Sequence, residues 1–170
     1  MSSPAQAANQ AVRRLLRQLG KEYDLKRGMK PFSDNKDIYV IRRYFKDKCC
    51  YCRKNIMDVQ WDKDHLIPMN KEQGGLHAWG NIVPSCKECN ATKQGSDWIA
   101  YIQSLYLDSN QEQSRVRRIK AFVRRYKYDL DENMSSDISK LATNLYISIT
   151  KYVSDEISIK LLEGKNILSK

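Results

Sequence analysis

The chain has 170 residues, of which 41% are hydrophobic and 29% charged, and its formal net charge at neutral pH is +10. This length suits one compact core with helical additions, and the composition excludes an intrinsically disordered chain. The positive charge favours a polyanionic partner, because lysine and arginine release condensed counterions when they neutralise phosphates. Charge alone leaves open a basic protein with a merely solvated surface.

The sequence also suggests a cellular compartment. It contains no apolar stretch of about 18 residues, and the first ten residues, MSSPAQAANQ, lack the charged-then-apolar order of a secretory signal. We therefore expect a cytoplasmic protein. In a reducing compartment, five grouped cysteines are better explained by metal binding than by disulfides.

The N-terminal part predicts two helices. Residues 4–20 place apolar side chains at helical spacing and stop at Gly20, which predicts an amphipathic helix with a C-terminal glycine. Ser33 is the expected N-cap of a second helix over residues 34–46. This part is strongly basic, since residues 1–47 carry 11 basic and 5 acidic side chains.

Short strands and turns are expected from residue 49 to about residue 95, where helical periodicity is absent. The apolar triplets VQW, LIP and NIV are the candidate strands, and a Gly-Gly turn lies between the last two. Ser85 begins an S-x-x-E capping-box pattern, so a helix is expected to begin at Cys86. One face of this helix carries Cys89, Asn90 and Lys93.

The C-terminal part predicts further helices over residues 97–107, 111–127 and 135–163, the last being one long helix or two shorter ones. The middle segment sets an apolar stripe among many basic residues. The stripe consists of Val116, Ile119, Val123 and Tyr126.

Two cysteine pairs predict a structural zinc site. Cys49-x-x-Cys52 and Cys86-x-x-Cys89 supply four thiolates, the ligand set of a closed tetrahedral zinc centre. Cys50 could replace Cys49, but the two-residue spacer to Cys52 matches the second pair. We therefore expect Cys50 to lie beside the metal without binding it. A closed set of four leaves zinc no open position, so its role is to hold the fold.

The segment between the cysteine pairs holds a second pattern: Asp64-His65-Leu-Ile-Pro, a Gly-Gly turn, Asn81, and Asn90-x-x-Lys93 after the last cysteine. This order resembles the HNH endonucleases, whose ββα-metal core carries D-H, a central N and a final H or N on the helix. The resemblance covers about residues 46–97. A cysteine pair on each side of the pattern makes it more specific than any single element.

The resemblance and the chemistry of phosphodiester hydrolysis assign a role to each residue. His65 is expected to act as general base on water. Asp64 and Asn90 are expected to hold a hard divalent ion, Mg²⁺ or alternatively Mn²⁺, which offsets charge on the phosphate. The resemblance implies that Asn81 orients the loop carrying the histidine. Many members have histidine at the third motif position. This chain offers Asn90 there and Lys93 one turn further on, and the sequence leaves the choice between these two residues open.

The expected fold class is α+β: a small ββα-metal, zinc-stapled core flanked by N-terminal and C-terminal helices. Three segments follow from this division. Residues 1–46 are expected to form a helical segment that supports the core or binds DNA, and residues 47–97 the nuclease core. Residues 98–170 are expected to bind DNA and are the candidate segment for dimerisation. The other histidine, His77, is expected to be a surface loop residue outside the site.

The expected activity is metal-dependent cleavage of double-stranded DNA by a restriction-type endonuclease. The alternatives are a non-catalytic zinc module that binds nucleic acid and a non-specific or nicking nuclease of phage type. A homodimer is expected, because one such centre attacks one strand, with the helix after residue 135 as its interface. The residues expected to contact DNA phosphates are Lys93, Arg115, Arg117, Arg118, Lys120, Arg124 and Arg125.

Overall fold

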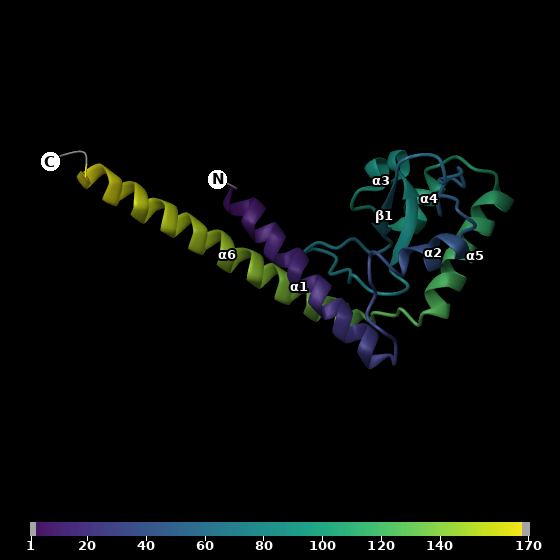
Figure 1. Ribbon diagram of the computed structural model, residues 1–170, viewed down its shortest axis with the longest axis horizontal. Coiled ribbons are helices and arrows are strands. Elements are labelled where there is room, and N and C mark those ends of the chain that lie inside the picture. Colours follow the sequence, from purple (N-terminus) through teal and green to yellow (C-terminus); the bar gives the residue numbers. More distant parts are fainter. Residues whose placement is uncertain (1–2, 168–170) are drawn as a thin grey trace.

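The computed structural model describes residues 3–167 and separates into a globular part and a projecting pair of helices (Figure 1). The pair consists of α1 (Pro4–Lys26) and α6 (Glu132–Ile167), which pack along one another. The globular part contains the strands and the shorter helices. Among the described residues, no helix combines the length and apolar character needed to cross a membrane.

The centre of the globular part is a ββα unit. Strands β1 (Trp61–His65) and β2 (Ile82–Cys86) pair antiparallel, with Asp64 opposite Val83. Helix α3 (Lys87–Lys93) follows β2 directly. Side chains alternate along a strand, and all of β2 is buried. The α+β class with flanking helices is confirmed.

The start of α3 differs from the expected capping box. Cys86 is the N-cap, and its sulfur accepts a hydrogen bond from the Cys89 backbone N–H at 3.5 Å. Ser85 is fully buried and its hydroxyl donates to the Cys86 carbonyl instead. The expected capping box is therefore wrong, because the cysteine sulfur takes the capping position.

Helix α1 does not end at Gly20, as the sequence suggested, but continues to Lys26. Gly20 is buried against the loop that carries His77, and a Cβ on it would lie 2.4 Å from the His77 carbonyl oxygen. The glycine therefore permits a close approach of two backbones and does not end the helix.

Helix α2 (Ile38–Tyr44) is shorter than expected and is not capped by Ser33. The Ser33 backbone N–H donates to the Asp37 carboxylate at 2.7 Å, and this contact closes a turn before the helix. Helices α4 (Trp98–Gln103) and α5 (Ser109–Arg125) complete the globular part. The expected stripe on α5 packs inward, with Ile119 fully buried.

The core consists of two apolar clusters, and one of them joins the two parts of the molecule. The larger lies in the globular part around Phe45, Ile82 and Phe122. The smaller joins the α1–α6 pair to the loop after β1 through Val12, Leu16, Leu76, Tyr128 and Ala142. The loop between the strands is thus fixed on one side by the sheet and on the other by α1. This position brings α1 close to the end of β1.

Candidate functional site

The sulfur atoms of Cys49, Cys52, Cys86 and Cys89 lie within 4.8 Å of one another. The Sγ atoms of Cys52 and Cys86 are 3.7 Å apart, close to the edge of about 3.8 Å that a tetrahedron with zinc–sulfur bonds of about 2.3 Å requires. Cys50 is buried outside the cluster. The geometry fits the expected zinc site, and this ligand grouping is confirmed.

Asp64 lies at the end of β1 and is 8% exposed. The Tyr51 hydroxyl donates to its Oδ2 at 2.5 Å, and the Lys93 ammonium is 3.2 Å from the same oxygen. Burial raises the pKa of Asp64, while Lys93 and Tyr51 act to lower it. Both contacts orient the carboxylate through one oxygen.

Lys93 was expected at the DNA, but its side chain is fully buried. Its ammonium pairs with Asp64 and donates to the His65 carbonyl at 2.9 Å. A lysine with no exposed surface does not reach a phosphate, so the expected DNA contact is wrong for this structure. Lys93 instead connects α3 to both members of the D-H dipeptide.

Asn81 is fully buried and fixes the loop after His65. Its side-chain oxygen accepts from the Ile67 N–H at 2.8 Å, and its amide nitrogen donates to the carbonyls of Ile67 and Leu76 at 3.0 and 2.8 Å. Three bonds to the backbone of one loop fit the orienting role that the sequence suggested.

Asn90 has a partner that sequence reasoning missed. Its amide nitrogen donates to Asp62 Oδ2 at 3.0 Å, and Lys87 contacts Asp62 Oδ1 at 2.8 Å. Fixing the amide nitrogen decides which way the amide oxygen of Asn90 points. The available signal was strand alternation, since Asp62 and Asp64 lie two residues apart on β1 and share a face.

The two histidines are in contact. His65 Nε2 lies 3.1 Å from His77 Nδ1. His77 is only 6% exposed, so its expected place as a surface loop residue is wrong. On its other side, His77 Nε2 lies 3.0 Å from the Arg17 guanidinium and 3.3 Å from Asp34 Oδ1. The occurrence of both histidines between the cysteine pairs was the signal for this contact.

Both imidazoles are held neutral. Burial, with smaller contributions from the nearby His77 and Arg17, lowers the pKa of His65 to about 3. Burial and the Arg17 charge lower the pKa of His77 to about 4. A neutral imidazole has one nitrogen with a free electron pair and can accept a proton there.

Comparison with known families agrees with this geometry: residues 49–96 match the HNH endonuclease family. This segment is an HNH domain. The match contains the cysteine cluster and every expected catalytic residue, while Arg17 and Asp34 lie outside it. No curated protein and no solved structure matches the chain.

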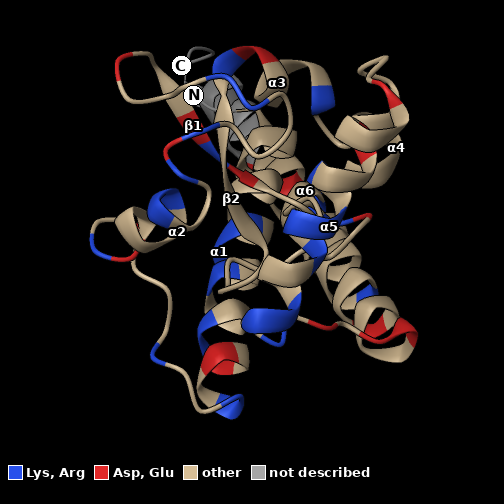
Figure 2. Ribbon diagram, turned by 90° about the vertical axis from the view of Figure 1, so that its right-hand side faces the viewer, with Lys and Arg blue, Asp and Glu red and all other residues tan. Residues whose placement is uncertain are grey.

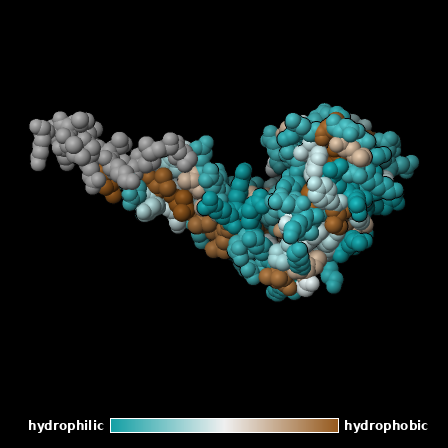
Figure 3. All heavy atoms as spheres, in the orientation of Figure 1, coloured by the Kyte–Doolittle hydropathy of each residue, from teal (hydrophilic) through white to brown (hydrophobic). Residues whose placement is uncertain are grey.

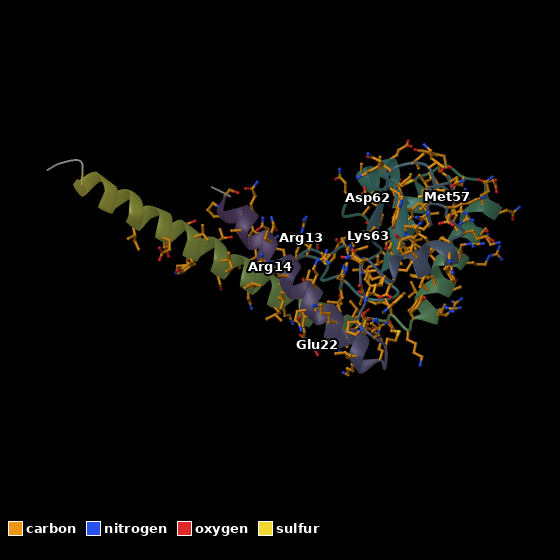
Figure 4. All side chains as sticks on the ribbon, viewed as in Figure 1. Arg13, Arg14, Glu22, Met57, Asp62 and Lys63 are labelled. Atoms are coloured by element: carbon orange, nitrogen blue, oxygen red, sulfur yellow. The ribbon has the colours of Figure 1, made fainter. Side chains whose placement is uncertain are left out.

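A cavity opens beside the HNH residues and is shared with α1. Asp64, His65 and Asn90 line it together with Arg13 and Arg17 of α1. The other lining residues are Lys63, Pro68, Met69, Asn70, Gln94 and Gly95. Arg13 lies on the side of α1 that faces Lys63 and Asp62 of β1 (Figure 4). The pocket therefore combines three of the expected catalytic residues, Asp64, His65 and Asn90, with the arginines of α1 from outside the HNH match.

The arginines of α5 lie elsewhere. Figure 2 views the molecule from the right-hand side of Figure 1, where α5 lies, and marks Lys and Arg positions of this helix in blue on the ribbon. In Figure 1, α5 lies at the end of the globular part opposite to the projecting tips of α1 and α6. The cavity with Asp64, His65 and Asn90 is therefore lined by cations of α1 and β1, whereas Lys120 and Arg124 of α5 line a different pocket, next to Asn81.

Proposed function

We propose that this protein is a metal-dependent endonuclease that hydrolyses phosphodiester bonds in double-stranded DNA. One observation carries the proposal: a single cavity is lined by the oxygen ligands Asp64 and Asn90, the neutral base His65, and the cations Arg13 and Arg17. Hydrolysis requires these three kinds of group around one phosphate. A module that only binds nucleic acid requires the cations alone.

The chain's own residues have distinct tasks in this reaction. His65 takes a proton from the attacking water, while Lys93 binds the His65 carbonyl and Asn81 binds the backbone of Ile67. Arg13 and Arg17 bind phosphate oxygens and orient the strand. Asp64 and Asn90 offer a carboxylate and an amide oxygen, which fit a hard ion such as Mg²⁺ or Mn²⁺. Such an ion supplies charge stabilisation at the phosphate.

The restriction-type activity needs two strands to be cut, and we propose that a homodimer does this through α6. Leu141, Tyr152 and Ile159 are 48%, 64% and 49% exposed, and their spacing places them on one face of the helix. Figure 3 shows hydrophobic side chains along the described part of α6. A helix that buries this face in a second copy would relate two centres by a two-fold axis.

Sedimentation tests the dimer directly. We expect twice the monomer mass, and Leu141→Glu with Tyr152→Glu should return the protein to a monomer that nicks but no longer linearises plasmid. A parental protein that sediments as a monomer both alone and on DNA contradicts the proposal. The nuclease assignment does not depend on this result.

Plasmid cleavage tests the nuclease assignment. The parental protein should convert supercoiled plasmid to nicked or linear form only when Mg²⁺ is added, since two protein oxygens are too few to retain the ion. His65→Ala should lower the rate by about 10²–10⁴-fold or more, because the general base is lost. Zinc content, melting temperature and DNA affinity should stay close to the parental values.

The digest also separates the alternatives. Discrete bands indicate a site-specific enzyme, and a smear indicates a non-specific one. Nicked circles without linear product indicate a nicking nuclease. Equal cleavage by the parental protein and the His65→Ala variant would refute the role of His65. Binding of DNA without cleavage in Mg²⁺ or Mn²⁺ would favour the non-catalytic module.

A further inference from the structure

The contact between the two histidines links their protonation. His65 Nε2 and His77 Nδ1 are 3.1 Å apart, so one nitrogen donates a hydrogen and the other accepts it. A neutral imidazole carries one hydrogen, so a ring that donates at one nitrogen has a free electron pair at the other. The hydrogen position on His77 therefore decides which nitrogen of His65 can act as a base.

His65 uses Nε2 for His77, which leaves Nδ1 as the nitrogen available to water. Nδ1 is a base only if Nε2 carries the hydrogen and donates it to His77. His77 must then accept at Nδ1 and carry its own hydrogen on Nε2. The active arrangement thus requires an acceptor beside His77 Nε2.

Two opposed groups compete at His77 Nε2. Asp34 Oδ1 lies 3.3 Å away and can accept a hydrogen from it. Arg17 lies 3.0 Å away and can only donate. Arg17 therefore favours the opposite arrangement, in which His65 carries its hydrogen on Nδ1 and cannot act as a base there.

The environment of Asp34 fits an acceptor that awaits a donor. Its Oδ1 is buried and, among the described residues, has no hydrogen-bond partner of acceptable geometry. Lys63 forms an ion pair with it at 2.9 Å and keeps the carboxylate in place. A carboxylate oxygen can accept more than one hydrogen bond, so a donor at His77 Nε2 would stabilise Oδ1 further beside the Lys63 ammonium.

Arg17 is the more exposed partner of the two. Its side chain is 46% exposed, it lines the cavity with Arg13, and it also contacts Asp34 Oδ2 at 3.2 Å. A phosphate in the cavity offers a guanidinium stronger hydrogen bonds than a neutral imidazole does. A bound DNA strand would therefore draw Arg17 away from His77.

We propose that Asp34, His77 and Arg17 form a substrate-operated switch that sets the base nitrogen of His65. A DNA phosphate takes Arg17, and His77 Nε2 then donates to Asp34. The shared hydrogen passes from His77 Nδ1 to His65 Nε2, His65 Nδ1 releases a proton to cavity water, and His77 Nε2 takes one up. Net charge is unchanged. The proposal rests on the nuclease function, and within it His77 and Asp34 are positioning residues.

Nuclear magnetic resonance can observe the switch directly, because the chain has only two histidines. The full protein is labelled with ¹⁵N-histidine and measured alone and with a mixed-sequence DNA duplex, without added Mg²⁺ to prevent cleavage. We expect His65 to carry its hydrogen on Nδ1 in the free protein and on Nε2 with DNA. The same arrangement in both samples would overturn the proposal.

Two variants separate the competing groups. Arg17→Met removes the donor, so the free protein should already show the DNA-bound arrangement, with weaker DNA binding. Asp34→Asn removes the carboxylate, so DNA should no longer move the hydrogen and kcat should fall by about 10–100-fold while KM changes little. Asp34→Glu should restore part of kcat. Asp137→Asn, an exposed carboxylate on α6, is the matched control.

The outcomes distinguish this proposal from the nuclease assignment. If the parental protein cuts and His65→Ala does not, but Asp34→Asn keeps full kcat, only the switch is wrong. If no preparation cuts DNA, the nuclease assignment is wrong. In that case, or if Asp34→Asn fails to fold, the NMR experiment on the parental protein still tests the switch. It shows whether DNA moves the imidazole hydrogens of His65 and His77, as the competition of Arg17 and Asp34 for His77 requires.

Discussion

Helix α3 borders two sites of opposite character. On one side the cysteine cluster gathers four sulfur atoms within 4.8 Å, and three of its members are buried. On the other side Asn90 lines a cavity together with Asp64, His65 and the two arginines of α1. The first site is saturated by its own ligands, whereas the second leaves space for a substrate.

The two sites also differ in where their residues come from. The cysteine cluster is built within residues 49–89, inside the HNH match. The cavity needs Arg13 and Arg17 from α1, and Asp34 supports it from the turn before α2. The cysteine cluster is therefore encoded within one segment of the chain, whereas the cavity also takes residues from the surrounding helices.

The largest expected effect comes from opening the cysteine cluster. Cys86→Ser, or removal of zinc by a chelator, should lose the fold, DNA binding and cleavage together, because zinc binding contributes to folding free energy. Cys86 also caps α3, which carries Asn90. The measurements are zinc stoichiometry, melting temperature and plasmid cleavage.

Cys50→Ser is the matched control for this experiment. Cys50 is buried beside the cluster but is not part of it. The variant should keep full zinc stoichiometry and cleave DNA, with a small loss of stability. Loss of zinc from Cys50→Ser and not from Cys86→Ser would show that the ligand set is different.

A smaller effect is expected from replacing Lys93, whose ammonium contacts Asp64 and the His65 carbonyl beside the cavity. Lys93→Met leaves the Asp64 carboxylate buried without its cation, which should lower the free energy of unfolding by about 3–5 kcal/mol. The His65 carbonyl also loses its donor, so kcat should fall by about 10–100-fold. Zinc content and the salt dependence of DNA binding should not change.

Lys140→Met, which removes an exposed lysine of α6, controls for the loss of one positive charge. If the Lys93→Met protein keeps the parental kcat but its DNA affinity depends less steeply on salt, the result would support the DNA contact of Lys93 that the sequence suggested. It would also mean that the buried position of Lys93 does not persist on DNA.

Patterns that depend on neighbouring residues were predictable from the sequence. The spacing of the cysteine pairs predicted the four sulfur atoms that cluster, and the D-H dipeptide and Asn90 predicted residues that line the cavity, while Asn81 binds the loop beside it. Apolar periodicity gave the helices, including the long α6. These signals are local, because the chain itself brings the residues together.

Features that depend on distant contacts were not predictable. Gly20 follows an apolar stripe and resembles a helix end, but its role depends on the His77 loop packed against it. A lysine on a helix is usually solvated, but Lys93 is buried with its ammonium against the Asp64 carboxylate and the His65 carbonyl. The partners of His77 were hidden for the same reason, since Arg17 and Asp34 are far from it in sequence.

The smallest expected effect on turnover comes from α5, which carries the arginines first expected at the DNA. Arg117 and Arg124 are exposed, and their seven-residue spacing places them on one face of the helix. We propose that they contact phosphates away from the cut. Replacing both with Gln should then weaken DNA binding for all sequences and reduce the slope of log affinity against log salt by about 2.

Turnover at saturating DNA should be unchanged in this double variant, because α5 does not line the cavity that holds His65 in the described structure. Lys151→Gln on α6, also exposed, controls for a change of charge far from both sites. The salt dependence of affinity and kcat are measured on the same preparations. If kcat falls while the slope of log affinity against log salt stays unchanged, α5 acts on the reaction itself. That result would contradict the proposal that the α1 arginines serve the cut and the α5 arginines bind phosphates away from it.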